Sequence, residues 1–163
     1  VSSMYDPLGI VSPVVLQGKL MLRELVQQKA DWDDPVPEEM RPRWEKWRAE
    51  LKELEKLEIQ RCVKPPKFGE LKSAEVHSSA DASQFAVGQV SYLRLVNEDD
   101  QIHVSFLMGK ARVAPLKLVS IPRLELTAAV ISVNVAQELC RQIDLNIDAT
   151  VYYSDSTVVL GYI

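Results

Sequence analysis

The sequence predicts an α/β fold in which a mixed sheet follows a helical segment. Three stretches in the middle of the chain alternate in the manner of strands, and a long helical stretch with a further strand comes after them. The predicted strands are residues 74–81, 86–95, 101–108 and 149–154, and the helix between the last two is residues 121–142. An acidic turn at residues 97–100 favours an antiparallel meander, and the long helix is a crossover that places the fourth strand parallel to a neighbour.

The first part of the chain is predicted to be helical. Apolar residues cover more than half of a helix over residues 14–28, which therefore needs packing partners on several sides. After a break with two prolines, Trp44 and Trp47 continue into a stripe of leucines that ends at Leu57. This stripe favours a core role for the two tryptophans over a base-stacking platform.

A change of pattern divides the chain near residue 70. Residues 62–69 contain two prolines and a glycine, and the spacing of apolar residues changes there from helical to alternating. The sequence thus predicts a helical connection at residues 1–70 and a sheet-bearing domain at residues 71–163. The first residue is not Met and the last residues begin a helix, which suggests a piece of a longer protein.

Composition limits the classes of function. With 163 residues, 47% of them hydrophobic, the chain is long enough to bury a core. Its net charge of −4 means that binding of nucleic acid must depend on a local basic patch. Two cysteines, Cys62 and Cys140, form neither a disulfide framework nor a zinc cluster, which favours a reducing, intracellular setting. No apolar stretch reaches the roughly 20 residues of a membrane span, so no membrane partner is expected.

Three acids lie where strand and helix ends are predicted. Asp81 ends the first strand, Glu125 lies in the first turn of the long helix, and Asp155 follows the fourth strand. Each has an ordinary alternative: Asp81 as a turn former, Glu125 as a partner of the positive helix N-terminus, and Asp155 as a helix cap. The helix face of Glu125 otherwise has small residues, which would let the helix approach the sheet and bring the acids together. Those residues are Ala128, Ala129, Ser132 and Ala136.

Three carboxylates favour magnesium or manganese chemistry. Their hard oxygen atoms suit Mg²⁺ or Mn²⁺, whereas zinc would need His or Cys ligands. Two such ions about 4 Å apart activate water and stabilise the leaving oxygen in phosphodiester hydrolysis. A basic stretch leads into the helix of Glu125 and is predicted to hold substrate phosphates, with a solvated loop as the alternative. Its members are Lys110, Arg112, Lys117 and Arg123.

Several motifs in one order resemble a known family along the whole chain. They are Tyr5-Asp6-Pro7-Leu8-Gly9, Trp32-Asp33-Asp34-Pro35, Arg43-Trp44, Asp81-Ala82-Ser83, Lys110-Ala111-Arg112-Val113-Ala114-Pro115-Leu116, Ile121-Pro122-Arg123-Leu124-Glu125-Leu126 and Tyr153-Ser154-Asp155-Ser156-Thr157-Val158-Val159-Leu160-Gly161. With these motifs the chain resembles the segment of BEL/Pao retrotransposon Pol polyproteins that follows the reverse transcriptase fingers and palm.

The second part is similar to the ribonuclease H-like fold of retroelements. The resemblance implies that Asp81, Glu125 and Asp155 are the metal-binding catalytic acids, with two ions, and that the RNA strand of an RNA–DNA hybrid is the substrate. It also implies a thumb-like connection at residues 1–70, the reverse transcriptase portion of the polyprotein as a partner, and a setting in the cytoplasm, a virus-like particle or the nucleus. The domain would be truncated, because a fourth carboxylate and the last strand would lie beyond Ile163.

Two other functions remain open on the sequence. The family also carries a peptidase label, but an aspartic peptidase needs Asp-Ser/Thr-Gly loops, and neither Asp81 nor Asp155 is followed by that pattern. A non-catalytic segment that braces the polymerase is the other alternative. His77, Ser79 and Asp81 should share one strand face, where His77 is predicted to have a structural or outer role.

Overall fold

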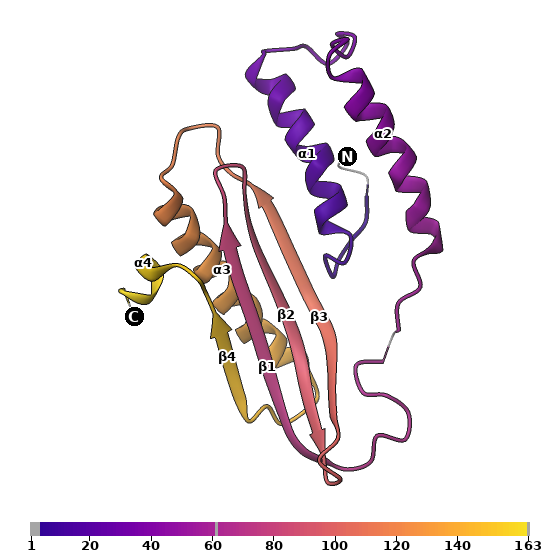
Figure 1. Cartoon of the computed structure of the whole chain (residues 1–163), viewed down its shortest axis with the longest axis vertical. Coiled ribbons are helices and arrows are strands. Elements are labelled where there is room, and N and C mark those ends of the chain that lie inside the picture. The colour runs from indigo at the N-terminus through magenta and orange to yellow at the C-terminus, as the bar shows by residue number, and fades with distance from the viewer. Residues whose placement is uncertain (1–3, 61, 163) are drawn as a thin grey trace.

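The computed structural model describes residues 4–60 and 62–162, which form a helical hairpin, a sheet and a long helix packed on that sheet (Figure 1). The helices are α1 Ser12–Gln27, α2 Arg41–Glu53, α3 Ile121–Gln142 and α4 Thr157–Leu160, with a 3-10 turn η1 Leu54–Lys56 after α2. The strands are β1 Leu71–Ala82, β2 Ala86–Asn97, β3 Ile102–Val113 and β4 Ala149–Tyr153.

The predicted mixed sheet is confirmed. The four strands lie in the order β3-β2-β1-β4, with β1 antiparallel to β2, β2 antiparallel to β3, and β4 parallel to β1. The helix between β3 and β4 has the predicted bounds, whereas the third strand continues to Val113 instead of ending at residue 108. The crossover through α3 places the end of β4 beside the central strand β1.

One face of the sheet is covered by α3 and contains the core. Buried residues alternate along β1 and β2, and the helix meets them with small side chains that are themselves buried, as predicted. Ala128 and Ala136 are fully buried and Ser132 is nearly so. The helix therefore lies close to the strands.

The helical hairpin has a core of its own around Trp47. This side chain is 5% exposed, and its indole N–H donates to the carbonyl oxygen of Val14 at 2.7 Å. A Cβ atom on Gly18 would lie 2.5 Å from the Trp47 ring, so only glycine allows this approach of α1 and α2. The predicted core role is confirmed for Trp47.

The turn before α1 holds the hairpin to the edge strand β3. The Asp6 carboxylate accepts the backbone N–H groups of Ile10 and Val11, and Gly9 has a positive φ of 73°. A Cβ atom on Gly9 would lie 1.8 Å from the carbonyl oxygen of Gly109, whose own N–H donates to the Leu8 carbonyl at 2.8 Å. Only glycine fits here.

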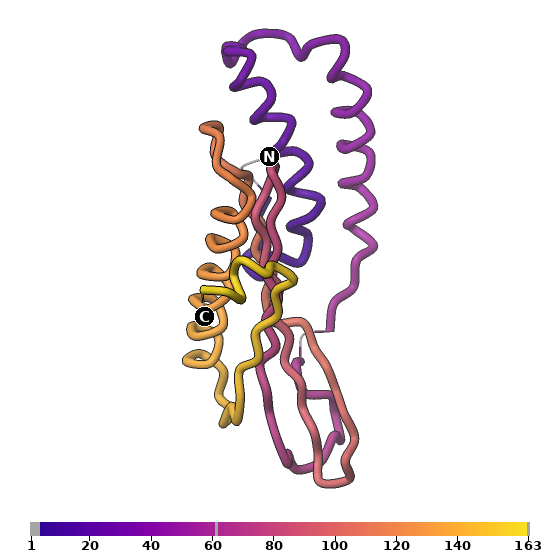
Figure 2. The backbone as a smooth tube through the Cα atoms, turned by 60° about the vertical axis from the view of Figure 1, so that its left-hand side comes forward, coloured from indigo at the N-terminus to yellow at the C-terminus, as the bar shows by residue number. Residues whose placement is uncertain are grey.

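Figure 2 shows α3 on one side of the strands and α1 on the other. Because the first part of the chain also contacts β3, the division near residue 70 stays a prediction. Within the described residues, no helix has the length and apolar character needed to cross a membrane. The face of β1 and β4 opposite α3 is the part of the sheet that bears the predicted acid Asp81.

Candidate active site

Asp81 lies near the end of β1, on the face opposite α3. His77, Ser79 and Asp81 alternate with Val76 and Ser78, which are buried under α3, so the first three share the predicted face. Asp81 is exposed and accepts the N–H of Ala82 at 2.6 Å.

The turn after β1 is formed by Ser83. Its hydroxyl accepts the N–H groups of Phe85 and Ala86 at 3.2 and 3.3 Å. The side chain that closes the turn is therefore a serine, and Asp81 is not needed as a turn former.

Asp155 follows β4 and lies across from Asp81. The helix cap of α4 is Ser156, whose hydroxyl accepts the N–H of Val159 at 3.2 Å, so the reading of Asp155 as the cap is wrong. Asp81 and Asp155 line the same hollow, which has a volume of about 520 Å³ and is bordered by Ser79 and Tyr153. The structure thus brings two of the three predicted acids to one cavity.

Glu125 does not line this cavity, but its carboxylate is bonded to Ser156, the residue after Asp155. The Ser156 hydroxyl donates to the Glu125 carboxylate at 2.5 Å, and Ser156 is only 6% exposed. Glu125 lies one position beyond the first four residues of α3 and has a specific partner, so complementing the helix N-terminus is not its main contact. Through Ser156, the third acid is connected to the residue next to Asp155.

The role of Ser156 was missed at the level of sequence. A serine directly before a helix is a recognisable capping signal, which would have identified its bond to Val159. Its bond to Glu125 joins residues 31 positions apart, which no local pattern reveals.

The three acids do not form an assembled metal site. Within residues 4–60 and 62–162, no three His, Cys, Asp or Glu side chains are gathered closely enough to serve together as ligands of one metal ion. Their carboxylate oxygens fit the preferences of Mg²⁺ and Mn²⁺, and Asp81 and Asp155 share one cavity. Glu125, the third predicted ligand, has its carboxylate engaged by Ser156.

A comparison with protein families decides which kind of domain this is. The family model for the Pao retrotransposon-like RNaseH-like domain matches residues 1–156. The chain belongs to this family. A search of the curated proteins and a search of the solved structures found no match. The mixed sheet of this Pao domain, with three antiparallel strands and a parallel fourth, is consistent with a ribonuclease H-like fold.

The predicted basic residues of the Pao domain are exposed, but they do not form one loop. Lys110 and Arg112 lie on β3, Lys117 lies in the connection to α3, and Arg123 lies in the first turn of α3. In the part of the chain that the structure describes, none of the four pairs with a carboxylate within 4 Å.

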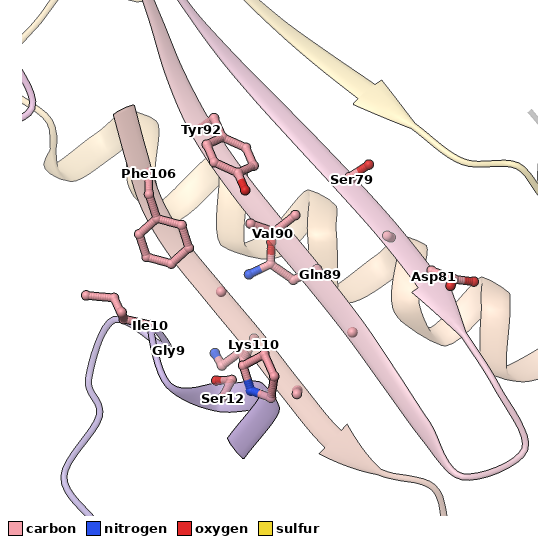
Figure 3. A pocket seen from close by; sticks show the side chains of 15 residues that line it. Gly9, Ile10, Ser12, Ser79, Asp81, Gln89, Val90, Tyr92, Phe106 and Lys110 are labelled. Carbon is pink, nitrogen blue, oxygen red and sulfur yellow. The ribbon is translucent and has the colours of Figure 1, made fainter. Parts of the chain in front are cut away.

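Lys110 and Asp81 lie on opposite faces of the sheet, because Lys110 pairs with Gln89, which is buried under α3, whereas Asp81 pairs with Gly88. Both residues nevertheless border a second hollow of about 670 Å³ between the sheet and the start of α1. In Figure 3, Asp81 lies near the end of β1 and Lys110 lies on β3. Lys110 also lines a hollow with Asn134 and Glu138 of α3, so its side chain lies on the helix-covered face and not beside the acids.

A polar network lies on the same sheet face as Asp81. Glu75 accepts bonds from Arg94 at 2.9 Å and from His77 at 3.1 Å. The bond from His77, together with that from Arg94, lowers the pKa of the Glu75 carboxyl against the effect of burial. His77 also bonds to the Tyr153 hydroxyl at 2.8 Å, so the network reaches the last residue of β4.

Proposed function

We propose that this Pao RNaseH-like domain hydrolyses the RNA strand of RNA–DNA hybrids during reverse transcription, with two Mg²⁺ or Mn²⁺ ions held by Asp81, Glu125 and Asp155. The observation that supports this most strongly is the cavity that Asp81 and Asp155 share, with Glu125 bonded to the residue that follows Asp155. Membership of the Pao RNaseH-like family supports the same class of reaction.

The chemistry of the three side chains suits this reaction. Bound divalent ions would activate a water molecule and stabilise the leaving oxygen of the phosphodiester. The protein would supply hard oxygen ligands from a strand, a helix and the segment after a second strand. Carboxylates that share a cavity repel one another, and a cation between them relieves that repulsion.

The proposed partners are the hybrid and the reverse transcriptase portion of the same polyprotein. Because the net charge is −4, the hybrid needs the local cations Lys110, Arg112, Lys117 and Arg123 for its phosphates. The helical hairpin of α1 and α2 would connect this domain to the polymerase. The proposed cleavage would take place where reverse transcription occurs inside the cell.

Replacing each acid by its amide tests the proposed activity. In Asp81→Asn, Glu125→Gln and Asp155→Asn, loss of a ligand should lower the rate of hybrid cleavage by roughly 100-fold or more, because metal ions supply several kcal/mol of charge stabilisation. Mn²⁺ binding, measured by calorimetry, should weaken in each. Asp144→Asn, which changes an exposed acid after α3, is the matched control. Unchanged Mn²⁺ affinity and cleavage in all three variants would contradict the proposal.

Neutralising the basic residues tests the proposed substrate contacts. Lys110→Gln and Arg112→Gln should each weaken hybrid binding and reduce its dependence on salt by roughly one ion for each phosphate that the variant no longer binds. Fluorescence anisotropy at several salt concentrations measures this slope. Lys29→Gln, an exposed cation at the end of α1, should leave the slope unchanged. If Lys29→Gln changes the slope as much, the binding is not specific to the basic stretch.

A further inference from the structure

Four side chains form a continuous line of hydrogen bonds across the open face of the sheet. Arg94 on β2 donates to Glu75 on β1 at 2.9 Å, and the same Glu75 oxygen lies 3.1 Å from His77 Nε2. His77 Nδ1 lies 2.8 Å from the hydroxyl of Tyr153, the last residue of β4. The line therefore joins three neighbouring strands.

The partners fix the direction of each bond. A carboxylate oxygen only accepts, so Nε2 of His77 must bear the hydrogen that it gives to Glu75. In the neutral imidazole the other nitrogen then has the lone pair, so Nδ1 accepts the Tyr153 hydroxyl. Glu75 thus sets the tautomer in which His77 can receive Tyr153.

The register of β4 places Asp155 level with Asp81. Tyr153 pairs with Ser79 in the parallel ladder, and Asp155 and Asp81 each lie two positions further along their segments. His77 contacts Tyr153 diagonally, and their rings stack with centroids 5.8 Å apart and planes at 18°. This contact is possible only in the observed register, because a slip by one residue would move Tyr153 by about 3.3 Å and turn it to the other face.

β4 has other contacts that fix this register at its opposite end, where the Asp148 carboxylate accepts the N–H of Ala74 at 2.9 Å and the Asp148 N–H donates to the Ala74 carbonyl at 2.8 Å. It has five residues, and in the described part of the chain it pairs with β1 alone. Its opposite end has a side-chain contact between Thr150 and Cys140 at 3.6 Å, far along the strand from the acids. Near the acids, the Tyr153 hydroxyl is the polar side-chain contact of the strand itself, and Ser156, three residues later, bonds to Glu125.

We propose that Tyr153 and His77 are positioning residues that lock the register of β4 and so hold Asp155 level with Asp81 for a shared divalent cation. Glu75 and Arg94 support this lock by orienting the His77 ring. The inference rests on the proposed function, since the shared cation is part of that function. It adds residues that are not themselves metal ligands.

Three variants separate the two bonds of His77. Tyr153→Phe removes the hydroxyl and keeps the stacked ring. His77→Gln places an amide near the Nε2 position, which keeps the bond to Glu75 and loses the acceptor for Tyr153. His77→Asn places its amide near the Nδ1 position, where its oxygen can accept the Tyr153 hydroxyl. His77→Asn is therefore the variant that should rescue the lock.

Mn²⁺ affinity, measured by calorimetry on the full chain, is the principal readout. Tyr153→Phe and His77→Gln should each bind Mn²⁺ about fivefold more weakly, as expected for the loss of one hydrogen bond that holds the site. His77→Asn should stay within about twofold of the original affinity. Thr150→Val, which removes the contact at the other end of β4, should leave Mn²⁺ affinity unchanged although it lowers the melting temperature.

Two results would overturn the proposal that Tyr153 and His77 fix the register of β4. Tyr153→Phe could bind Mn²⁺ as tightly as the original chain, or Thr150→Val could weaken binding as much as Tyr153→Phe, which would indicate general loosening of β4. If the original chain binds no Mn²⁺ at all, the proposed function fails, and NMR then decides the lock alone. The amide resonances of Ser154 and Asp155 should shift in Tyr153→Phe and His77→Gln and stay in place in His77→Asn; resonances unmoved in all three would refute it.

Discussion

The two faces of the sheet use polar side chains in opposite ways. Under α3, the Ser78 hydroxyl bonds to Ser91 at 2.8 Å and to Ser132 of the helix at 2.7 Å, and all three serines are buried. On the other face, Glu75 and His77 are 28% and 22% exposed and form charge-assisted bonds. Neighbouring residues of one strand, β1, supply both sets.

The difference shows how burial decides the kind of polar group that a strand can bear. A hydroxyl can be removed from water if it finds a partner, whereas a charge needs pairing and is costly even then. Neutral serines therefore join α3 to the sheet, and charged groups stay on the side where water, ions or substrate can reach them. The predicted acid Asp81 belongs to the second side.

Valine-to-alanine substitutions on the two faces of β2 should give the largest difference in the free energy of unfolding. Val87 is 5% exposed and packs with Leu124 and Ala128 under α3, while Val90 lies half-buried on the other face. Val87→Ala should lower the free energy of unfolding by about 2–3 kcal/mol, because two methyl groups are lost and a cavity remains. Val90→Ala should cost about 1 kcal/mol or less. Urea unfolding measures both, and equal losses would contradict the contrast.

Of two adjacent serines on β1, the one under α3 should also contribute more to stability than the one on the other face. Ser78→Ala removes the partner of the buried Ser132 hydroxyl, while Ser91 keeps its bond to Gln89, and the change should cost about 1–3 kcal/mol. Ser79→Ala, on the other face, should stay within about 0.5 kcal/mol of the original stability. Thermal unfolding of the pair tests this. A neutral Ser78→Ala would show that the serine chain adds nothing to the packing of α3.

Elements specified by local signals could be predicted from the sequence. The helix at residues 121–142 has a strong apolar period, and the acidic turn at residues 97–100 is closed by Asn97, whose side-chain oxygen accepts the N–H groups of Asp99 and Gln101. Such contacts involve residues close in sequence, so patterns of a few residues reveal them.

Contacts between distant residues could not be predicted in this way. The bond from Ser156 to Glu125 and the line from Glu75 to Tyr153 depend on the register of β4 against β1. Register comes from packing of the whole sheet, and a shift of one position exchanges the faces. The sequence therefore identified the three acids as candidate metal ligands, but it did not reveal that Ser156 bonds to Glu125.

The charge of Glu75, on the sheet face opposite α3, should have the smallest of the predicted effects on stability. It should appear as a dependence of the free energy of unfolding on pH. Bonds from His77 and Arg94 lower the pKa of Glu75 in the folded chain below its ordinary value of about 4.3. The ionised carboxylate therefore stabilises the fold above that ordinary value, and this stabilisation is lost as the pH falls through the lowered pKa. Glu75→Gln should thus be less stable than the original chain near neutral pH, and the difference should shrink on acidification. Urea unfolding from pH 7 to about 3 measures it, with Glu70→Gln, an exposed acid just before β1, as the control. A difference that stays constant over this range would mean that the charge of Glu75 does not contribute to the contrast between the faces.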